Sequence, residues 1–138
     1  MLPWSEVALR LLIALVLSSL IGWEREYRHK PSGFRTNILV GLGATLVMIV
    51  SLAFGDDPAR LAAGVVTGIG FLGAGLIIQA QGQIHGITTA ASVWLVAAVG
   101  LAVGIGYYSA AVITTVIALI VLFLFGNQKV RDRFKLND

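Results

Sequence analysis

Five apolar segments, each about as long as a membrane-spanning helix, constrain this chain more than any other feature. They cover approximately residues 5–23, 36–54, 60–79, 87–104 and 107–126. A helix needs about 20 residues to cross roughly 30 Å of hydrocarbon. Because only short connections separate the segments, the sequence predicts an all-α polytopic membrane bundle of about five transmembrane helices.

Three of these predicted spans allow another interpretation. The first could be the apolar core of a cleaved signal peptide, but "SSLIGWERE" is a poor cleavage site. Its outer end contains Glu6 and Arg10, whose spacing predicts an ion pair, with Arg10 extending to the membrane interface. The fourth and fifth segments, divided only by "GIGYY", could form one broken helix, although two spans fit the bilayer thickness better.

The composition excludes several classes of function. Charged residues make up 12% of the chain and the mean hydropathy is +0.88, whereas an average soluble domain has roughly 25% charged residues. Without cysteine there is no thiol nucleophile or thiolate metal site. No cluster of metal-ligating histidines and no Ser/His/Asp arrangement is visible, so we expect neither an enzyme nor a cofactor. The basic residues lie between apolar segments rather than on one soluble face, so we expect no nucleic-acid partner.

The basic residues predict the orientation in the membrane. Eight of the ten lie in two regions, four within 25–35 and four within 129–135. An odd number of spans places both regions on one side, and the positive-inside rule makes that side the cytoplasm. We therefore expect an external amino terminus, a transmembrane domain over 1–128 and a basic cytoplasmic tail over 129–138.

The stretch "TGIGFLGAGLI" contains G-x-G-x-x-G at Gly68, Gly70 and Gly73. A dinucleotide site would need a preceding strand and an acidic residue about 20 positions later, but the chain has Ala91, Ser92 and Val93 there. Small residues instead let transmembrane helices approach closely, as in a helix packed centrally between its neighbours. Local unwinding of the helix beside a cavity is the alternative. The residues assigned to helix packing are Gly64, Thr67, Gly68, Gly70, Gly73 and Gly75.

The stretch "GWEREYRHKPSGFRTN", residues 22–37, carries most of the charge in the apolar part of the chain. Its basic residues suit anionic lipid headgroups. We interpret Glu24 and Glu26 as partners of nearby arginines, Arg28 being at pairing distance from Glu24. The alternative is that the two carboxylates bind a hard cation or a proton, which makes them weak metal candidates.

Polar residues also lie inside two predicted spans. Asn37 needs a hydrogen-bond partner, because an unsatisfied amide is costly in hydrocarbon. Thr88 and Ser92 are four residues apart, and we expect their hydroxyls to bond to carbonyls of their own helix. The alternative is an interhelical polar cluster that includes Asn37.

Three stretches in order, "IGWEREYRHKPSGFRTNILVGLGA", "VVTGIGFLGAGLI" and "GITTAASVWLVAAVGLAVGIGYY", resemble the membrane domain of the MgtC/SapB family over about residues 7–126. The resemblance implies a multi-pass protein of the bacterial inner membrane, linked to magnesium homeostasis, acid stress, virulence and survival inside host cells. MgtC itself carries a soluble carboxy-terminal regulatory domain, whereas this chain stops at "KVRDRFKLND", so the resemblance does not extend to that domain's roles. Besides the helix-packing positions, the motif residues are Glu24, Arg25, Glu26, Lys30, Pro31, Gly33, Arg35, Thr36, Asn37, Thr88, Thr89, Ala90, Ser92 and Trp94.

The predicted topology brings these motifs to the cytoplasmic end of the bundle. We expect a polar vestibule there, built from Glu24, Arg25, Arg35, Asn37, Thr88 and Thr89. The leading functional hypothesis is a non-enzymatic regulator in the lipid bilayer that forms a homo-oligomer or binds another membrane protein. The alternatives are a small transporter or channel for Mg²⁺ or protons and, third, an intramembrane enzyme.

Overall fold

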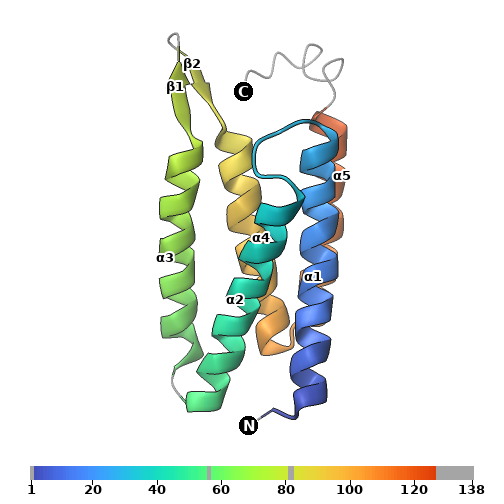
Figure 1. Ribbon diagram of the computed structural model, residues 1–138, viewed down its shortest axis with the longest axis vertical. Helices are drawn as coiled ribbons and strands as arrows, with labels where there is room; N and C mark the ends of the chain where they lie inside the picture. Colours follow the sequence, from blue (N-terminus) through green and yellow to red (C-terminus); the bar gives the residue numbers. More distant parts are fainter. Residues whose placement is uncertain (1, 56, 81–82, 127–138) are drawn as a thin grey trace.

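Five helices run side by side in the computed structural model of the chain (Figure 1). The structure describes residues 2–55, 57–80 and 83–126, so the predicted tail at 129–138 lies outside the described residues. Each helix has at least 18 residues and is apolar enough to cross a membrane, which confirms the predicted bundle with five spans. The helices are α1 (Trp4–Tyr27), α2 (Phe34–Phe54), α3 (Pro58–Leu76), α4 (Ile87–Ile105) and α5 (Tyr108–Phe125).

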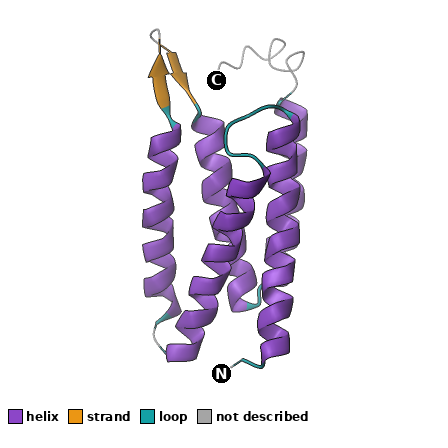
Figure 2. Ribbon diagram, viewed as in Figure 1, coloured by secondary structure: helices purple, strands orange, loops and turns teal. Residues whose placement is uncertain are grey.

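A short hairpin replaces the predicted end of the third span. The helix ends at Leu76 rather than near residue 79, and strands β1 (Ile78–Ala80) and β2 (Gln83–His85) pair antiparallel (Figure 2). Gly86 then adopts a φ of 91°, where a Cβ would collide with the carbonyl oxygen of Leu76. This left-handed conformation is easily accessible only to glycine.

The connections alternate between the two ends of the bundle (Figure 1). We call one end the hairpin end, because it carries the hairpin together with the α1–α2 connection and the last turn of α5. The amino terminus and the α2–α3 and α4–α5 turns lie at the opposite end. This arrangement is the one that five spans require, and the cytoplasmic location of the hairpin end stays a prediction.

Helix α4 is the central element and contacts each of the other four helices. Its closest approach is to α2, where Gly100 and Gly104 face the α2 backbone. The Thr45 hydroxyl on α2 donates a 2.8 Å hydrogen bond to the Gly100 carbonyl. A G-x-x-x-G pair therefore does bring two helices together, as small residues do in membranes, but it lies in α4.

Helix α3 lies at the edge of the bundle, so its predicted central position is wrong. It packs only against α4 and α2 among the helices, and the span is 6% buried. Of its glycines, only Gly73 has a neighbour, Ala90 Cβ, 3.6 Å from where its own Cβ would be. The helix is continuous, so it has neither the local unwinding nor the strand that the other interpretations need. A Cβ would meet nothing within 4 Å at Gly64, Gly68, Gly70 and Gly75.

The end opposite the hairpin holds a buried polar cluster. Arg10 Nε pairs with Glu6 Oε1 at 2.8 Å, which confirms the predicted ion pair. Arg10 is only 8% exposed, however, and its Nη1 donates to the Gly104 carbonyl at 2.6 Å. A last-turn carbonyl of α4 without a helical partner thus accepts the Arg10 guanidinium, and the extension of Arg10 to the membrane interface stays a prediction. The Tyr108 hydroxyl completes the cluster with a 2.7 Å hydrogen bond to Glu6.

Candidate functional site

A fully buried carboxylate organises the hairpin end of α1. Glu24 has no exposed surface, and Arg25, on the same turn, is 2% exposed. Arg25 Nε donates a 2.6 Å hydrogen bond to Glu24 Oε2. Arg28 Nε lies 2.6 Å from Glu24 Oε1 in an ion pair whose N–H is not aligned as a hydrogen bond. The interpretation of Glu24 as the partner of arginines is therefore confirmed, and the pairing offsets the cost of burying the charges.

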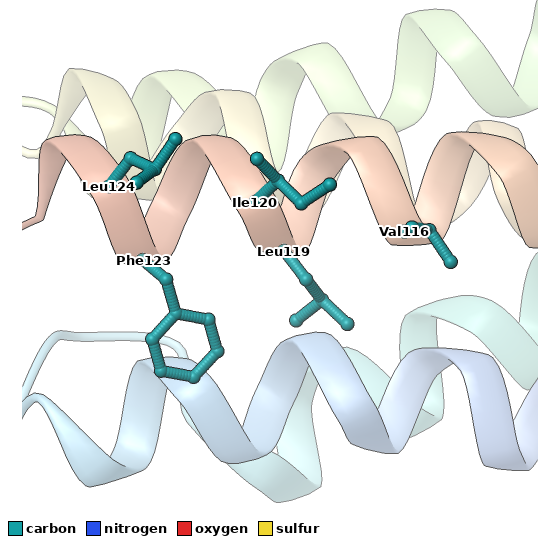
Figure 3. Close-up of a pocket in the computed structure, with 5 residues that line it drawn as sticks. All are labelled: Val116, Leu119, Ile120, Phe123 and Leu124. Atoms are coloured by element: carbon teal, nitrogen blue, oxygen red, sulfur yellow. The ribbon is translucent and has the colours of Figure 1, made fainter.

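Arg28 also ties α1 to α5. Its Nη2 donates a 3.0 Å hydrogen bond to the Phe123 carbonyl, and its guanidinium carbon lies 5.4 Å from the centre of the Phe123 ring. Figure 3 shows Phe123 projecting from α5 toward α1. The hollow drawn there has a volume of about 330 Å³ and only aliphatic and aromatic lining residues, so it suits hydrocarbon and not a polar ligand.

Glu26 has a different role from Glu24. Its Oε2 accepts a 2.8 Å hydrogen bond from the backbone N–H of Phe34, one of the first-turn amides of α2 that lack a helical acceptor. Gly33 permits this approach, since a Cβ there would lie 2.8 Å from the same oxygen. No ion pair joins Glu26 to an arginine among the described residues, so the predicted pairing does not extend to it.

Asn37 stabilises the α1–α2 connection rather than an interhelical cluster. It is fully buried, and its Nδ2 donates to the carbonyls of Ser32 and Gly33 at 2.6 and 2.9 Å. Ser92 Oγ donates to the Thr89 carbonyl of its own helix at 2.8 Å, as expected. The alternative of a cluster that joins Asn37 to the hydroxyls of α4 is therefore wrong.

A cavity of about 460 Å³ opens between the end of α1, the start of α4 and the end of α5. We call it the basic cavity; its polar lining residues are Arg25, Arg28, Lys30, His85, Thr88 and Thr89, and apolar residues, mostly of α4 and α5, line the rest. None of its described lining residues is acidic. Gly86 provides no side-chain cap at the start of α4, so the first amides of this helix have no helical acceptor.

The basic cavity corresponds only in part to the predicted vestibule. Arg25, Thr88 and Thr89 line it together, and Lys30 and Pro31 join them. His85, which the sequence analysis did not include, lines the cavity too. Of the other expected residues, Glu24 is buried against Arg25 and Arg28, Asn37 faces its own connection, and Arg35 and Thr36 are exposed elsewhere.

The two carboxylates proposed as weak metal candidates have separate partners. Glu24 pairs with arginines, and Glu26 accepts a backbone amide. Within residues 2–55, 57–80 and 83–126, no three His, Cys, Asp or Glu side chains are placed to hold a metal ion together.

Comparisons with known proteins cover most of the chain. A family model described as the MgtC family matches residues 11–130. The "Putative magnesium transporter YhiD" of Escherichia coli (strain K12) is 43% identical over 131 residues, covering 88% of this chain and 61% of that protein. "Protein MgtC" of Brucella abortus is 46% identical over 121 residues, covering 86% and 51%, respectively. The chain thus spans about half to three fifths of these relatives, and no solved structure matches it.

Proposed function

The chain belongs to the MgtC family, and we propose that this multi-pass membrane protein is a non-enzymatic regulator in the bacterial inner membrane. It acts by binding a second copy of itself or another membrane protein. The setting is the one that the family resemblance implies: magnesium homeostasis, acid stress and survival inside host cells. The magnesium link is also supported by the name of the Escherichia coli relative.

The observation that carries this proposal is the outer face of α3. At about 100° per residue, Gly64, Gly68 and Gly75 lie within about 40° of one another. A Cβ at any of the three would meet nothing within 4 Å in the part of the chain that the structure describes. Phe71 lies on the same face and is 83% exposed. Small residues that allow a close approach, with no helix of the chain against them, suit a helix from another molecule.

The interior of the bundle favours a regulator over a channel. The inward side of α4 presents Val93, Val96, Val99 and Val103, each at most 2% exposed. The buried carboxylate Glu24 is already paired with Arg25 and Arg28. A permeating cation would need oxygen ligands or water along its path; the valines offer neither, and the buried hydroxyls of Thr45 and Thr115 donate to helix carbonyls.

A transporter or channel for Mg²⁺ or protons is the second candidate. It is favoured by the name of the Escherichia coli relative, which describes that protein as a magnesium transporter. A flux assay with the purified full chain in proteoliposomes separates the two. We expect no saturable uptake of Mg²⁺ or protons above that of empty liposomes. Saturable uptake would overturn the regulator proposal.

Site-specific photo-crosslinking in native membranes tests the proposed binding face. A crosslinking amino acid in place of Phe71 should give a protein adduct of discrete mass. The matched position is Ile113 on α5, which is 58% exposed and should give none. Equal adducts at both positions, or none at Phe71, would contradict binding through α3, and an adduct of twice the chain mass would identify a second copy.

A further inference from the structure

The basic cavity has an excess of positive charge. Arg25, Arg28 and Lys30 line it, and among the described residues the one carboxylate that pairs with any of them is the buried Glu24. Three cations against one anion leave a net charge of about +2 at the cavity, to which the start of α4 adds a partial positive charge. The site therefore attracts an anion.

Hydrogen-bond donors in the cavity are not all used. Arg25 is 2% exposed, and its Nε donates a hydrogen bond to Glu24. Its Nη1 and Nη2 donate to no acceptor among the described residues. The side chains of Thr88 and Thr89 and the uncapped first turn of α4 line the same space. A guanidinium, hydroxyls and free amides at a helix start are the groups that bind a phosphate.

An apolar groove leads from the basic cavity into the membrane-spanning part of the bundle. We call it the α4–α5 groove; it has a volume of about 480 Å³ and shares Thr88, Val121 and Leu122 with the cavity. From Thr88 it follows α4 to Leu95, which at about 1.5 Å per residue is about 10 Å along the helix. The groove and the cavity together match a ligand with an anionic head and a hydrocarbon tail.

We propose that the hairpin end binds one anionic phospholipid of the adjacent leaflet. Its headgroup phosphate contacts Arg25, Lys30 and the start of α4, and one of its acyl chains lies in the α4–α5 groove. The geometry distinguishes this site from a general attraction of basic residues to anionic lipid, because Arg35 is exposed at the start of α2 but does not line the cavity. The proposal holds whether the protein regulates a partner or transports an ion.

Trp94 provides a local probe, because it lines the α4–α5 groove and is 46% exposed. The other two tryptophans, Trp4 and Trp23, are exposed and can be replaced by Phe. This variant of the full chain is reconstituted in phosphatidylcholine bilayers that contain a small fraction of phosphatidylglycerol with brominated acyl chains. Bromine quenches tryptophan only at close range, so we expect brominated phosphatidylglycerol to quench Trp94 more than the same fraction of brominated phosphatidylcholine does.

Two matched pairs of variants test the site. We expect Lys30→Gln to lower about fivefold the preference of the site for phosphatidylglycerol over phosphatidylcholine, as measured by quenching of Trp94. Arg35→Gln should change this preference less than twofold. Ala91 lies in the groove and Ala110 is exposed near the other end of α5. Ala91→Phe should reduce the quenching by both lipids relative to Ala110→Phe, since it fills the groove without changing a charge.

Four results would overturn the proposal. Equal quenching by the two brominated lipids would show that the cavity does not select an anionic head. Equal effects of Lys30→Gln and Arg35→Gln would indicate diffuse surface charge. Complete competition by millimolar glycerol phosphate would indicate a site for a free phosphoester rather than a lipid. Protection of Trp94 from both lipids would show that the groove is covered and holds no acyl chain.

Discussion

The close contact between α2 and α4 makes a quantitative prediction about Gly100. A Cβ at this position would lie 2.5 Å from the Gly41 carbonyl oxygen and 3.0 Å from Ala44 Cβ. A backbone carbonyl inside a helix cannot rotate away, so Gly100→Ala must push α2 and α4 apart. The same shift lengthens the 2.8 Å hydrogen bond from Thr45 to the Gly100 carbonyl.

The expected cost follows from three contributions. Overpacking a tight contact costs about 1–3 kcal/mol, and a weakened interhelical hydrogen bond costs about 0.6 kcal/mol. Replacing glycine by alanine inside a helix stabilises the helix by about 1 kcal/mol. We therefore expect Gly100→Ala to lower the free energy of unfolding by about 0.6–2.6 kcal/mol. Gly68→Ala has the same intrinsic helix gain and no obstructing atom within 4 Å, so it should leave that free energy unchanged or raise it by up to about 1 kcal/mol.

Equilibrium unfolding by SDS in mixed micelles, followed by tryptophan fluorescence, measures both variants on the full chain. Wild-type stability of Gly100→Ala would refute the close approach of α2 and α4. A loss in Gly68→Ala as large as that in Gly100→Ala would mean that the exposed face of α3 is packed in the micelle. The size-exclusion profile of the same samples would then show whether a second copy is bound.

Three further predictions concern the hairpin end and the topology. Glu24→Gln leaves two arginines without their buried carboxylate partner and should lower the free energy of unfolding by about 3 kcal/mol with or without Mg²⁺. Glu26→Gln keeps an oxygen that accepts the backbone amide and should cost less than about 1 kcal/mol. A Mg²⁺-dependent stabilisation of the wild type that Glu24→Gln abolishes would contradict this prediction. Gly86→Ala should destabilise the chain by more than about 1 kcal/mol in the same SDS titration, and full stability would contradict the collision with the Leu76 carbonyl. Topology reporters within 28–32 and after residue 138 should be cytoplasmic and one within 55–58 external, and an external carboxy terminus would exclude the five-span orientation.

Local features of the sequence were sufficient for the spans and for pairs within one helix. Segment length and hydropathy identify a transmembrane helix because a single helix satisfies its own backbone in lipid. The pairs Glu6–Arg10 and Glu24–Arg28 were predictable because residues four apart on a helix are neighbours whatever the tertiary structure. The errors at the end of the third span arose where strand pairing, which depends on a second segment, stopped the helix.

The choice of contacting faces depended on the tertiary structure. Both α3 and α4 carry G-x-x-x-G pairs, at Gly64 and Gly68 and at Gly100 and Gly104, yet only the α4 pair faces another helix of the chain. Lipid and protein interior are equally apolar, so hydrophobic periodicity cannot indicate which side of a membrane helix is inside.

The composition of the basic cavity was likewise decided by packing. The sequence placed Arg25, Thr88 and Thr89 at one end of the bundle, but only the positions of α1, α4 and α5 brought them to one space and left Arg35 outside it. Packing also brought the Gly104 carbonyl of α4 within hydrogen-bond distance of Arg10. The sequence by itself thus determined which segments cross the membrane and which charges can pair locally. The tertiary structure decided which hydrogen-bond donors remain unused, because it determines which acceptors lie beside them. The Gly104 carbonyl, 94 positions from Arg10 in the chain, becomes its neighbour only when the helices pack.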